Sequence, residues 1–298
     1  MGNRGWRFGV VALVLAVVAG CSDKARNESA AVPTTTTPTT TGENEQIGCL
    51  TTGAAATTTP ATPQSFAPRL RVQTTQGSAA VWAEIQHELS TYQKSDYQHT
   101  TSLDRTAGTY IVDCSGWGNV LLRIASCNAY GDLVQSANAA RKTDFSTSCQ
   151  LPTGTVEHGP YAVDWASMLA KLTPGQTSGH WTRVAHVPDL VPGDVVTYAL
   201  GPGAQDTGHV MFVAGTPTVD PQDPTQWRVP IADSTASEHG PDDSRAGNSR
   251  NVDGKGIGSA ALELIVDGGG APTDRFRWYP GAPKIDQVPA PVMLGHFG

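Results

Sequence analysis

The sequence predicts an α+β domain in which helices come first and an antiparallel sheet follows. Two observations carry this prediction. Between residues 79 and 171 apolar residues recur at helical spacing, whereas after Val184 short runs rich in β-branched and aromatic residues are bounded by Gly, Pro and Asp. Helices followed by a series of strands are typical of α+β folds, in which the two kinds of element do not alternate.

Four helices are expected, each from its own pattern. Val81, Ile85 and Leu89 stand on one face of a helix over about residues 79–94. A second helix is expected to begin at Cys114, directly after the extended run "GTYIVDC", and to end near residue 127. The segments "DLVQSANAARK" and "PYAVDWASMLAKL" predict two more, the last with Pro160 near its first position.

Five strands are expected in the second half of the domain. They are "DVVTYAL", "GHVMFVAG", "WRVPIADST", "ALELIVD" and "RFRWYPG". A Pro-Gly turn in "LVPGDVVTYAL" opens the first of them. We expect the four helices to pack on this sheet.

The amino-terminal segment predicts an exported protein. "MGNRGWRFGVVALVLAVVAGC" has a basic start, a short apolar run and small residues before Cys21, as an export signal does. "VAGC" resembles the bacterial lipobox, which implies that residues 1–21 form a lipoprotein signal peptide with Cys21 as the lipidated residue. The alternative is an ordinary cleaved signal with a chance cysteine. Residues 22–69 are rich in Thr, Pro and Ala, so we expect a disordered tether before a folded domain over 70–290.

Charge and composition narrow the possible partners. The net charge of −7 argues against nucleic acid, and no second long apolar run is present. The histidines lack metal-ligand spacing, so neither a metal nor another cofactor is expected. The acidic stretches "VDPQDPTQ" and "HGPDDSR" are interpreted as solvated loops, and we expect a monomer.

The five cysteines call for separate explanations. Cys21 is assigned to the lipid, and Cys49 lies in the tether. Cys127 and Cys149 flank a short segment and are expected to pair, with Cys49 as a rival partner for either. Cys114 stands at a strand-to-helix junction. There a helix amino terminus can lower the pKa of a thiol and make it nucleophilic.

A nucleophilic cysteine also needs a histidine held at a fixed place. Five of the eight histidines lie on a helix or in polar loops, and His296 lies in the tail. His209 and His239 remain. His209 starts the strand "GHVMFVAG", where a side chain is held more rigidly than in a loop.

Three motifs in order, "DCSG", "LVPGDVV" and "GHVMFVAG", resemble the marks of the NlpC/P60 family of cysteine peptidases. The resemblance implies a papain-like fold and cleavage of peptide bonds in peptidoglycan stem peptides. It implies Cys114 as nucleophile, His209 as general base and backbone N–H groups at the helix start, including that of Cys114, as the oxyanion hole. The family's third polar residue lies on the next strand, where Asp233 is the first candidate and His239 the alternative.

The chain departs from the family pattern in three places. Cys114 and His209 are 209 − 114 = 95 residues apart, which is long for the family. Trp117 stands where a smaller apolar residue is usual, and Met211 replaces a glycine.

The first functional hypothesis is therefore a cell-wall cysteine peptidase, lipid-anchored to the outer face of the bacterial cytoplasmic membrane. The alternatives are an N-acetylmuramoyl-L-alanine amidase, as in the related CHAP family, and a non-catalytic lipoprotein that binds the wall.

Overall fold

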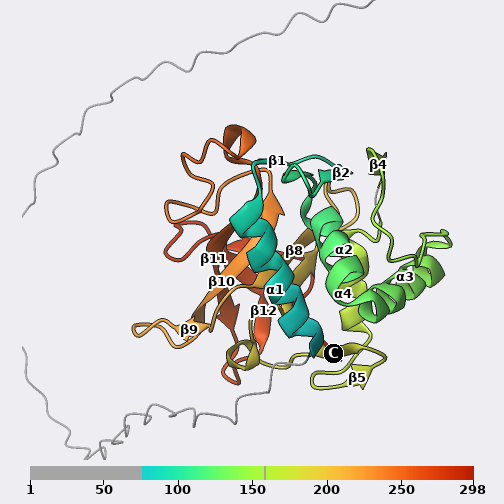
Figure 1. Ribbon diagram of the computed structural model, residues 1–298. Coiled ribbons are helices and arrows are strands. Elements are labelled where there is room, and N and C mark those ends of the chain that lie inside the picture. Colours follow the sequence, from blue (N-terminus) through green and yellow to red (C-terminus); the bar gives the residue numbers. More distant parts are fainter. Residues whose placement is uncertain (1–75, 158) are drawn as a thin grey trace, which may run out of the picture. The chain divides into compact units, whose positions relative to one another are not determined.

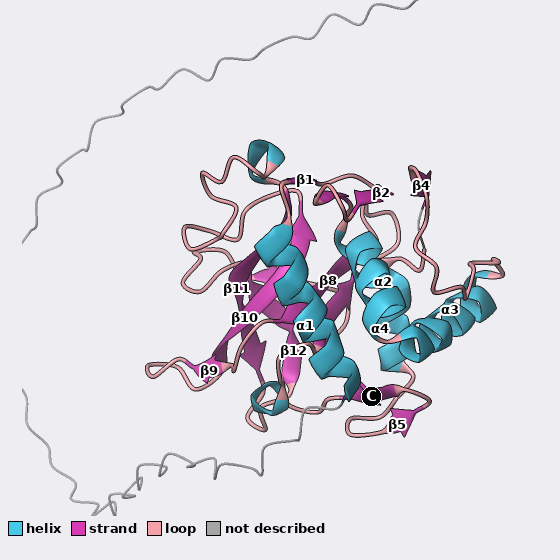
Figure 2. Cartoon of the chain, viewed as in Figure 1, coloured by secondary structure: helices cyan, strands magenta, loops and turns pink. Residues whose placement is uncertain are grey.

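The computed structural model describes residues 76–157 and 159–298 (Figure 1, Figure 2). The predicted signal peptide with Cys21, the tether over 22–69 and the first residues of the predicted domain lie outside the described residues. Within the described part of the chain, no helix combines the length and apolar character needed to cross a membrane.

Four α-helices form where the apolar periodicity predicts them. They are α1 (Gln76–Thr91), α2 (Cys114–Ala125), α3 (Cys127–Arg141) and α4 (Ala162–Ala170). Helix α1 is shifted about one turn toward the amino terminus relative to the expected 79–94. Helix α2 ends at Ala125 because Ser126 leaves the helical region, with φ −150°, and the chain re-enters a helix at once as α3.

The strands form one large and one small sheet. The large sheet has the order β13-β12-β11-β10-β8-β7-β14-β6-β5, with β9 also paired to β10, and its neighbours run antiparallel. Its strands are β5 (Thr177–Ser178), β6 (Trp181–Arg183), β7 (Val195–Ala199), β8 (Gly208–Val213), β9 (Thr218–Val219), β10 (Gln226–Thr235), β11 (Gly256–Val266), β12 (Pro272–Arg277), β13 (Asp286–Gln287) and β14 (Met293–Phe297). The small sheet, β1-β3-β2-β4, contains β1 (Lys94–Asp96), β2 (Thr100–Asp104), β3 (Thr109–Ile111) and β4 (Val156–Glu157).

The fold is α+β, as the sequence predicts. Helices α1, α2 and α4 pack against the large sheet and lie in front of its strands in the view of Figure 1. Alternate residues of β8 are buried on opposite faces: Val210 and Phe212 join the core beneath the helices, whereas Met211 and Val213 join a second core on the other face. Because both faces are buried there, β8 is apolar from Val210 to Val213, and only its first two residues, Gly208 and His209, reach the site described below.

The predicted disulfide is present between Cys127 and Cys149, with Cα atoms 5.7 Å apart. It ties the start of α3 to the chain between α3 and α4, of which residues 142–157 and 159–160 are described. This part of the chain is called here the disulfide-anchored segment.

The folded domain extends past the expected limit of residue 290. Strand β14 pairs with β7 on one side and β6 on the other, and it brings His296 into the interior. The Nδ1 atom of His296 lies 2.6 Å from Asp194, and the Ser78 hydroxyl of α1 donates to the same carboxylate at 2.8 Å. The expectation that His296 lies in a tail was therefore wrong, and Asp194 of the "PGD" turn holds the two ends of the domain together.

Candidate active site

Cys114 occupies the first position of α2, three residues after β3 ends at Ile111. Asp113 is the N-cap of this helix, and its carboxylate accepts a hydrogen bond from the Gly116 N–H at 2.7 Å. Such a cap satisfies one of the free N–H groups of the first turn and fixes where the helix begins. Trp117 and Leu121, one turn and two turns further on, are buried against α1 and the sheet, so the helix start is held rigidly.

The environment of the Cys114 thiol differs from the sequence prediction. The residue is 3% exposed, and burial raises the pKa of the thiol well above its usual value. The Asp113 carboxylate raises it further, whereas a hydrogen bond from the Val210 N–H to the sulfur lowers it by less. The expectation of a lowered pKa was wrong because the thiol is buried and the helix start carries a capping anion, two effects that oppose the helix dipole.

His209 and Asp233 lie on neighbouring strands of the large sheet. His209 is the second residue of β8, Asp233 lies on β10, and these two strands pair antiparallel. The Nε2 atom of His209 is 2.6 Å from Oδ2 of Asp233, a short charge-assisted hydrogen bond. This bond assigns the ring proton to Nε2 and leaves Nδ1 as the basic nitrogen.

Asp233 lies at the centre of a buried ionic network. Its side chain is completely buried, and its other oxygen accepts from the Arg245 guanidinium, which also pairs with Asp243 at 2.6 Å. Burial raises the pKa of the Asp233 carboxyl, but Arg245, His239 and His209 together hold it well below its usual range. Asp233 is therefore an anion in the folded protein, able to orient the His209 ring and to balance a positive charge on it.

His239, the alternative candidate, lies on the far side of Asp233. Its Nε2 atom is 2.9 Å from the same Oδ2 atom that His209 approaches, and its Nδ1 atom is 2.8 Å from the Trp278 carbonyl oxygen. Both partners are oxygen acceptors, so each ring nitrogen faces an acceptor. It stacks on Trp278 with centroids 3.8 Å apart, and the His209 and His239 centroids are 6.3 Å apart.

His209, Asp233 and His239 also have the residue types of a metal site. The Nε2 atoms lie only 2.6 and 2.9 Å from the shared Asp233 oxygen. Two ligands of one tetrahedral ion, each about 2.0–2.1 Å from it, would stand roughly 3.3 Å apart. The separations fit hydrogen bonds, and the Arg245 cation beside Asp233 disfavours a second cation there.

A cavity of about 430 Å³ opens above the thiol. Its lining includes Cys114, Asp113, Tyr97, His99 and Gly208, the residue before His209. Cys114 and His209 make no hydrogen bond to each other in the described structure. Such contacts are often long in a free enzyme and tighten around a substrate.

Sequence reasoning missed two residues of the site. Tyr97 lines the thiol cavity, and burial together with the nearby charge of Asp113 raises the pKa of its hydroxyl, which therefore stays a donor. Arg245 belongs to "HGPDDSR", interpreted above as a solvated loop, yet Arg245 and Asp243 are buried. The one sequence signal of this buried ion pair was an arginine at the end of an acidic stretch.

Comparison with known proteins does not assign this chain to a family. No protein-family model matches the chain, and no solved structure matches it. A protein of Acanthamoeba polyphaga mimivirus, named only as uncharacterized, is 26% identical over 245 residues, which cover 74% of this chain and 96% of that protein. That name assigns no activity, so the function has to be argued from the site.

Proposed function

We propose that the protein is a cysteine peptidase of the NlpC/P60 type, with a papain-like arrangement of its helices and sheet. Cys114 is the nucleophile, His209 the general base and Asp233 the residue that orients it. The single observation that carries the proposal is the 2.6 Å bond between His209 and the buried Asp233 carboxylate, beside a cavity lined by a cysteine at a helix start. The substrates are peptide bonds of peptidoglycan stem peptides.

The raised pKa of Cys114 sets the order of the first steps. The thiol rests in its neutral form, so its proton passes to Nδ1 of His209 as the sulfur attacks the peptide carbonyl. The imidazolium that forms is balanced by Asp233 through the Nε2–H bond. The oxyanion of the tetrahedral intermediate is bound by the backbone N–H of Cys114 and the Tyr97 hydroxyl.

The remaining steps return the enzyme to its resting state. The His209 imidazolium donates its proton to the leaving amine as the C–N bond breaks, which leaves a thioester on Cys114. His209 then takes a proton from water, the hydroxide adds to the thioester carbonyl, and the thiolate leaves and is reprotonated. The products are a free amine and a carboxylate, one water molecule being consumed.

His239 and Arg245 act through Asp233 in this proposal. Both bond to Asp233, lower the pKa of its carboxyl and hold it in place, so they are positioning residues. The assignment of His239 as the direct partner of His209 is the less favourable one, because Asp233 stands between the two rings.

The proposed location follows from the amino-terminal sequence. The Cys21 lipid anchor would hold the protein at the outer face of the cytoplasmic membrane, and the tether would let the domain reach the wall. A disulfide between Cys127 and Cys149 is compatible with an oxidising compartment.

Digestion of purified peptidoglycan by the full chain tests the activity. Mass spectrometry of the products separates a peptidase, which splits stem peptides, from an amidase, which frees whole stems from the sugar. Cys114→Ala and His209→Ala are expected to abolish product formation, whereas His87→Ala, which changes an exposed histidine of α1, retains it. Wall binding without products from the unaltered chain would favour the non-catalytic alternative.

A further inference from the structure

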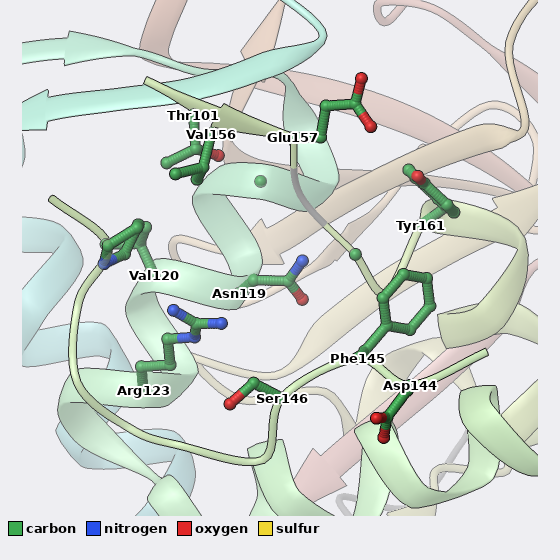
Figure 3. A pocket seen from close by; sticks show the side chains of 13 residues that line it. Thr101, Asn119, Val120, Arg123, Asp144, Phe145, Ser146, Val156, Glu157 and Tyr161 are labelled. Atoms are coloured by element: carbon green, nitrogen blue, oxygen red, sulfur yellow. The ribbon is translucent and has the colours of Figure 1, made fainter. Parts of the chain in front are cut away.

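A second cavity, here called the α2 cavity, shares two lining residues with the thiol cavity. It has a volume of about 360 Å³. One wall is a single face of α2, with Gly116, Asn119, Val120 and Arg123 at helical spacing. The disulfide-anchored segment forms the opposite wall, and the side chains of Phe145 and Ser146 face Asn119 and Arg123 across the cavity (Figure 3).

Buried polar atoms without partners gather at this cavity. Within residues 76–157 and 159–298, seven buried side-chain polar atoms lack a hydrogen-bond partner, and three of them belong to its lining: Thr101 Oγ1, Asn119 Oδ1 and Arg123 Nε. Thr101 is 2% and Asn119 is 4% exposed. Leaving such groups unpaired is costly, and their concentration at one cavity points to a ligand that pairs with them.

Asn119 and Arg123 specify the chemistry of that ligand. The amide nitrogen of Asn119 donates to the Pro160 carbonyl at 2.8 Å, which fixes Oδ1 as an acceptor in need of an N–H donor. Arg123 donates to the Gln150 carbonyl at 3.1 Å and to the Tyr130 hydroxyl at 2.6 Å. No carboxylate among the described residues pairs with Arg123, so its positive charge lacks a counter-ion there.

The acidic residues of the lining do not supply that counter-ion. Asp144 and Glu157 are exposed, and neither forms an ion pair with Arg123. A ligand that brings a carboxylate to Arg123 and a peptide N–H to Asn119 satisfies both groups at once.

The α2 cavity continues the thiol cavity along α2. Glu157 and Tyr161 line both. Cys114 and Arg123 are nine positions apart on the helix, or about 13 Å at ~1.5 Å per residue. An extended peptide covers ~3.3 Å per residue, and long helical side chains lean toward the amino terminus, so the span corresponds to about two to four substrate residues.

We propose that the α2 cavity is a specificity subsite that binds a carboxylate of the peptide substrate, about two to four residues from the bond that is cut. Arg123 binds the carboxylate, and Asn119 accepts a peptide N–H beside it. This inference rests on the proposed function, because it places the subsite by its distance from Cys114. The carboxylate is either the terminal carboxylate of the peptide or that of an acidic side chain. Converting one or the other to a carboxamide distinguishes the two sources.

Binding to the Cys114→Ala chain tests the subsite without relying on turnover. The probes are fluorescent stem peptides in three forms: unmodified, with the terminal carboxylate as a carboxamide, and with the side-chain carboxylates as carboxamides. One carboxamide form is expected to bind about 10- to 100-fold more weakly than the unmodified peptide. Loss with the terminal amide identifies the free end, and loss with the side-chain amides identifies an acidic residue.

Arg123 variants in the same background assign the effect to the cavity. Arg123→Gln is expected to bind all three peptides with the weak affinity of the sensitive carboxamide. Arg123→Lys keeps the charge and is expected to keep part of the discrimination. Arg228→Gln, at a half-exposed arginine on β10, is the matched control and is expected to bind as its parent does. Melting temperatures of all variants verify that each is folded.

The outcomes separate the subsite from the chemistry. Equal affinity for all three peptides, or discrimination that survives Arg123→Gln, overturns the subsite. If the peptides are discriminated through Arg123 but the unaltered chain does not cleave peptidoglycan, the proposed function is overturned and the carboxylate site remains supported. In an active enzyme, the same carboxamide is expected to lower kcat/KM by a similar factor, and Arg123→Gln removes that difference.

Discussion

Replacing Asp233 with asparagine removes one charge from a closed ionic network. In this network the Arg245 guanidinium pairs with the Asp233 and Asp243 carboxylates, and both histidine rings bond to Asp233. Asparagine is nearly the same size, so no cavity forms. Its amide, however, places an NH₂ group against either the two histidine rings or the Arg245 guanidinium, and the buried Arg245 loses one of its two carboxylate partners.

The size of the effect follows from this geometry. Removing one partner of a buried ion pair costs about 3–5 kcal/mol. For a domain of this size, each kcal/mol lowers the melting temperature by about 2–4 °C, so Asp233→Asn is expected to melt about 6–20 °C below the unaltered chain at pH 7. Catalysis is expected to fall by orders of magnitude even in the folded fraction, because the amide can hold His209 in the wrong tautomer.

The pH dependence gives a second readout. The pKa of Asp233 is lowered in the folded protein, so its stabilisation is present above the unfolded value of about 3.9 and is lost as the pH falls through the lower folded value. The part of the gap that comes from the ionisation of Asp233 is therefore expected to persist at and above about pH 4 and to be lost only below it.

Thermal unfolding followed by circular dichroism measures both effects. Asp242→Asn, at a carboxylate that is 80% exposed, is the control and is expected to leave the melting temperature unchanged. A melting temperature for Asp233→Asn within about 2 °C of the unaltered chain at pH 7 would refute the account, since the network would then carry less than about 1 kcal/mol.

Three further predictions concern groups whose environment the structure defines. Because burial raises the pKa of Cys114, iodoacetamide is expected to alkylate it more slowly at pH 8 than it alkylates free cysteine. The rate is measured by mass spectrometry, and a faster reaction would mean that Cys114 rests as a thiolate. Burial raises the pKa of Glu88 to about 8 although Arg105 lies 3.7 Å away. Glu88→Gln is therefore expected to leave the free energy of unfolding unchanged at pH 4 and to raise it increasingly as the pH rises toward 8, as measured by urea titration. An equal effect at both pH values would contradict this. Replacing both Cys127 and Cys149 by alanine is expected to lower the free energy of unfolding by roughly 3 kcal/mol. Reducing the disulfide of the unaltered chain is expected to lower it by the same amount, and a difference between the two would contradict the prediction.

Much of the framework could be predicted from local sequence pattern. Helical and strand periodicity are local signals, and they located α2, β8 and β10, the three elements that carry Cys114, His209 and Asp233. The Cys127–Cys149 pair was also predictable, because little sequence separates the two residues.

The electrostatics of the site could not be predicted in this way. The sign of the Cys114 pKa shift depends on burial and on the N-cap charge of Asp113, and sequence reasoning weighed only the helix dipole. His239 and Arg245 reach Asp233 only through the loop after β10, which composition alone marks as solvated. The strand β14 was missed because "MLGHF" is short and carries a buried histidine whose partner, Asp194, lies 102 positions away.

The position of β14 between β7 and β6 also makes the sheet depend on the last strand of the domain. Strand β6 ends at Arg183 and β7 begins at Val195, yet they are bridged by residues 293–297. In Figure 1 the carboxyl end lies beside the first turn of α1, where Ser78 reaches Phe297. Without β14, strands β6 and β7 have no strand between them, and Ser78 loses its contact with Phe297. The native sheet is therefore complete only when residues 293–297 have taken their place in it.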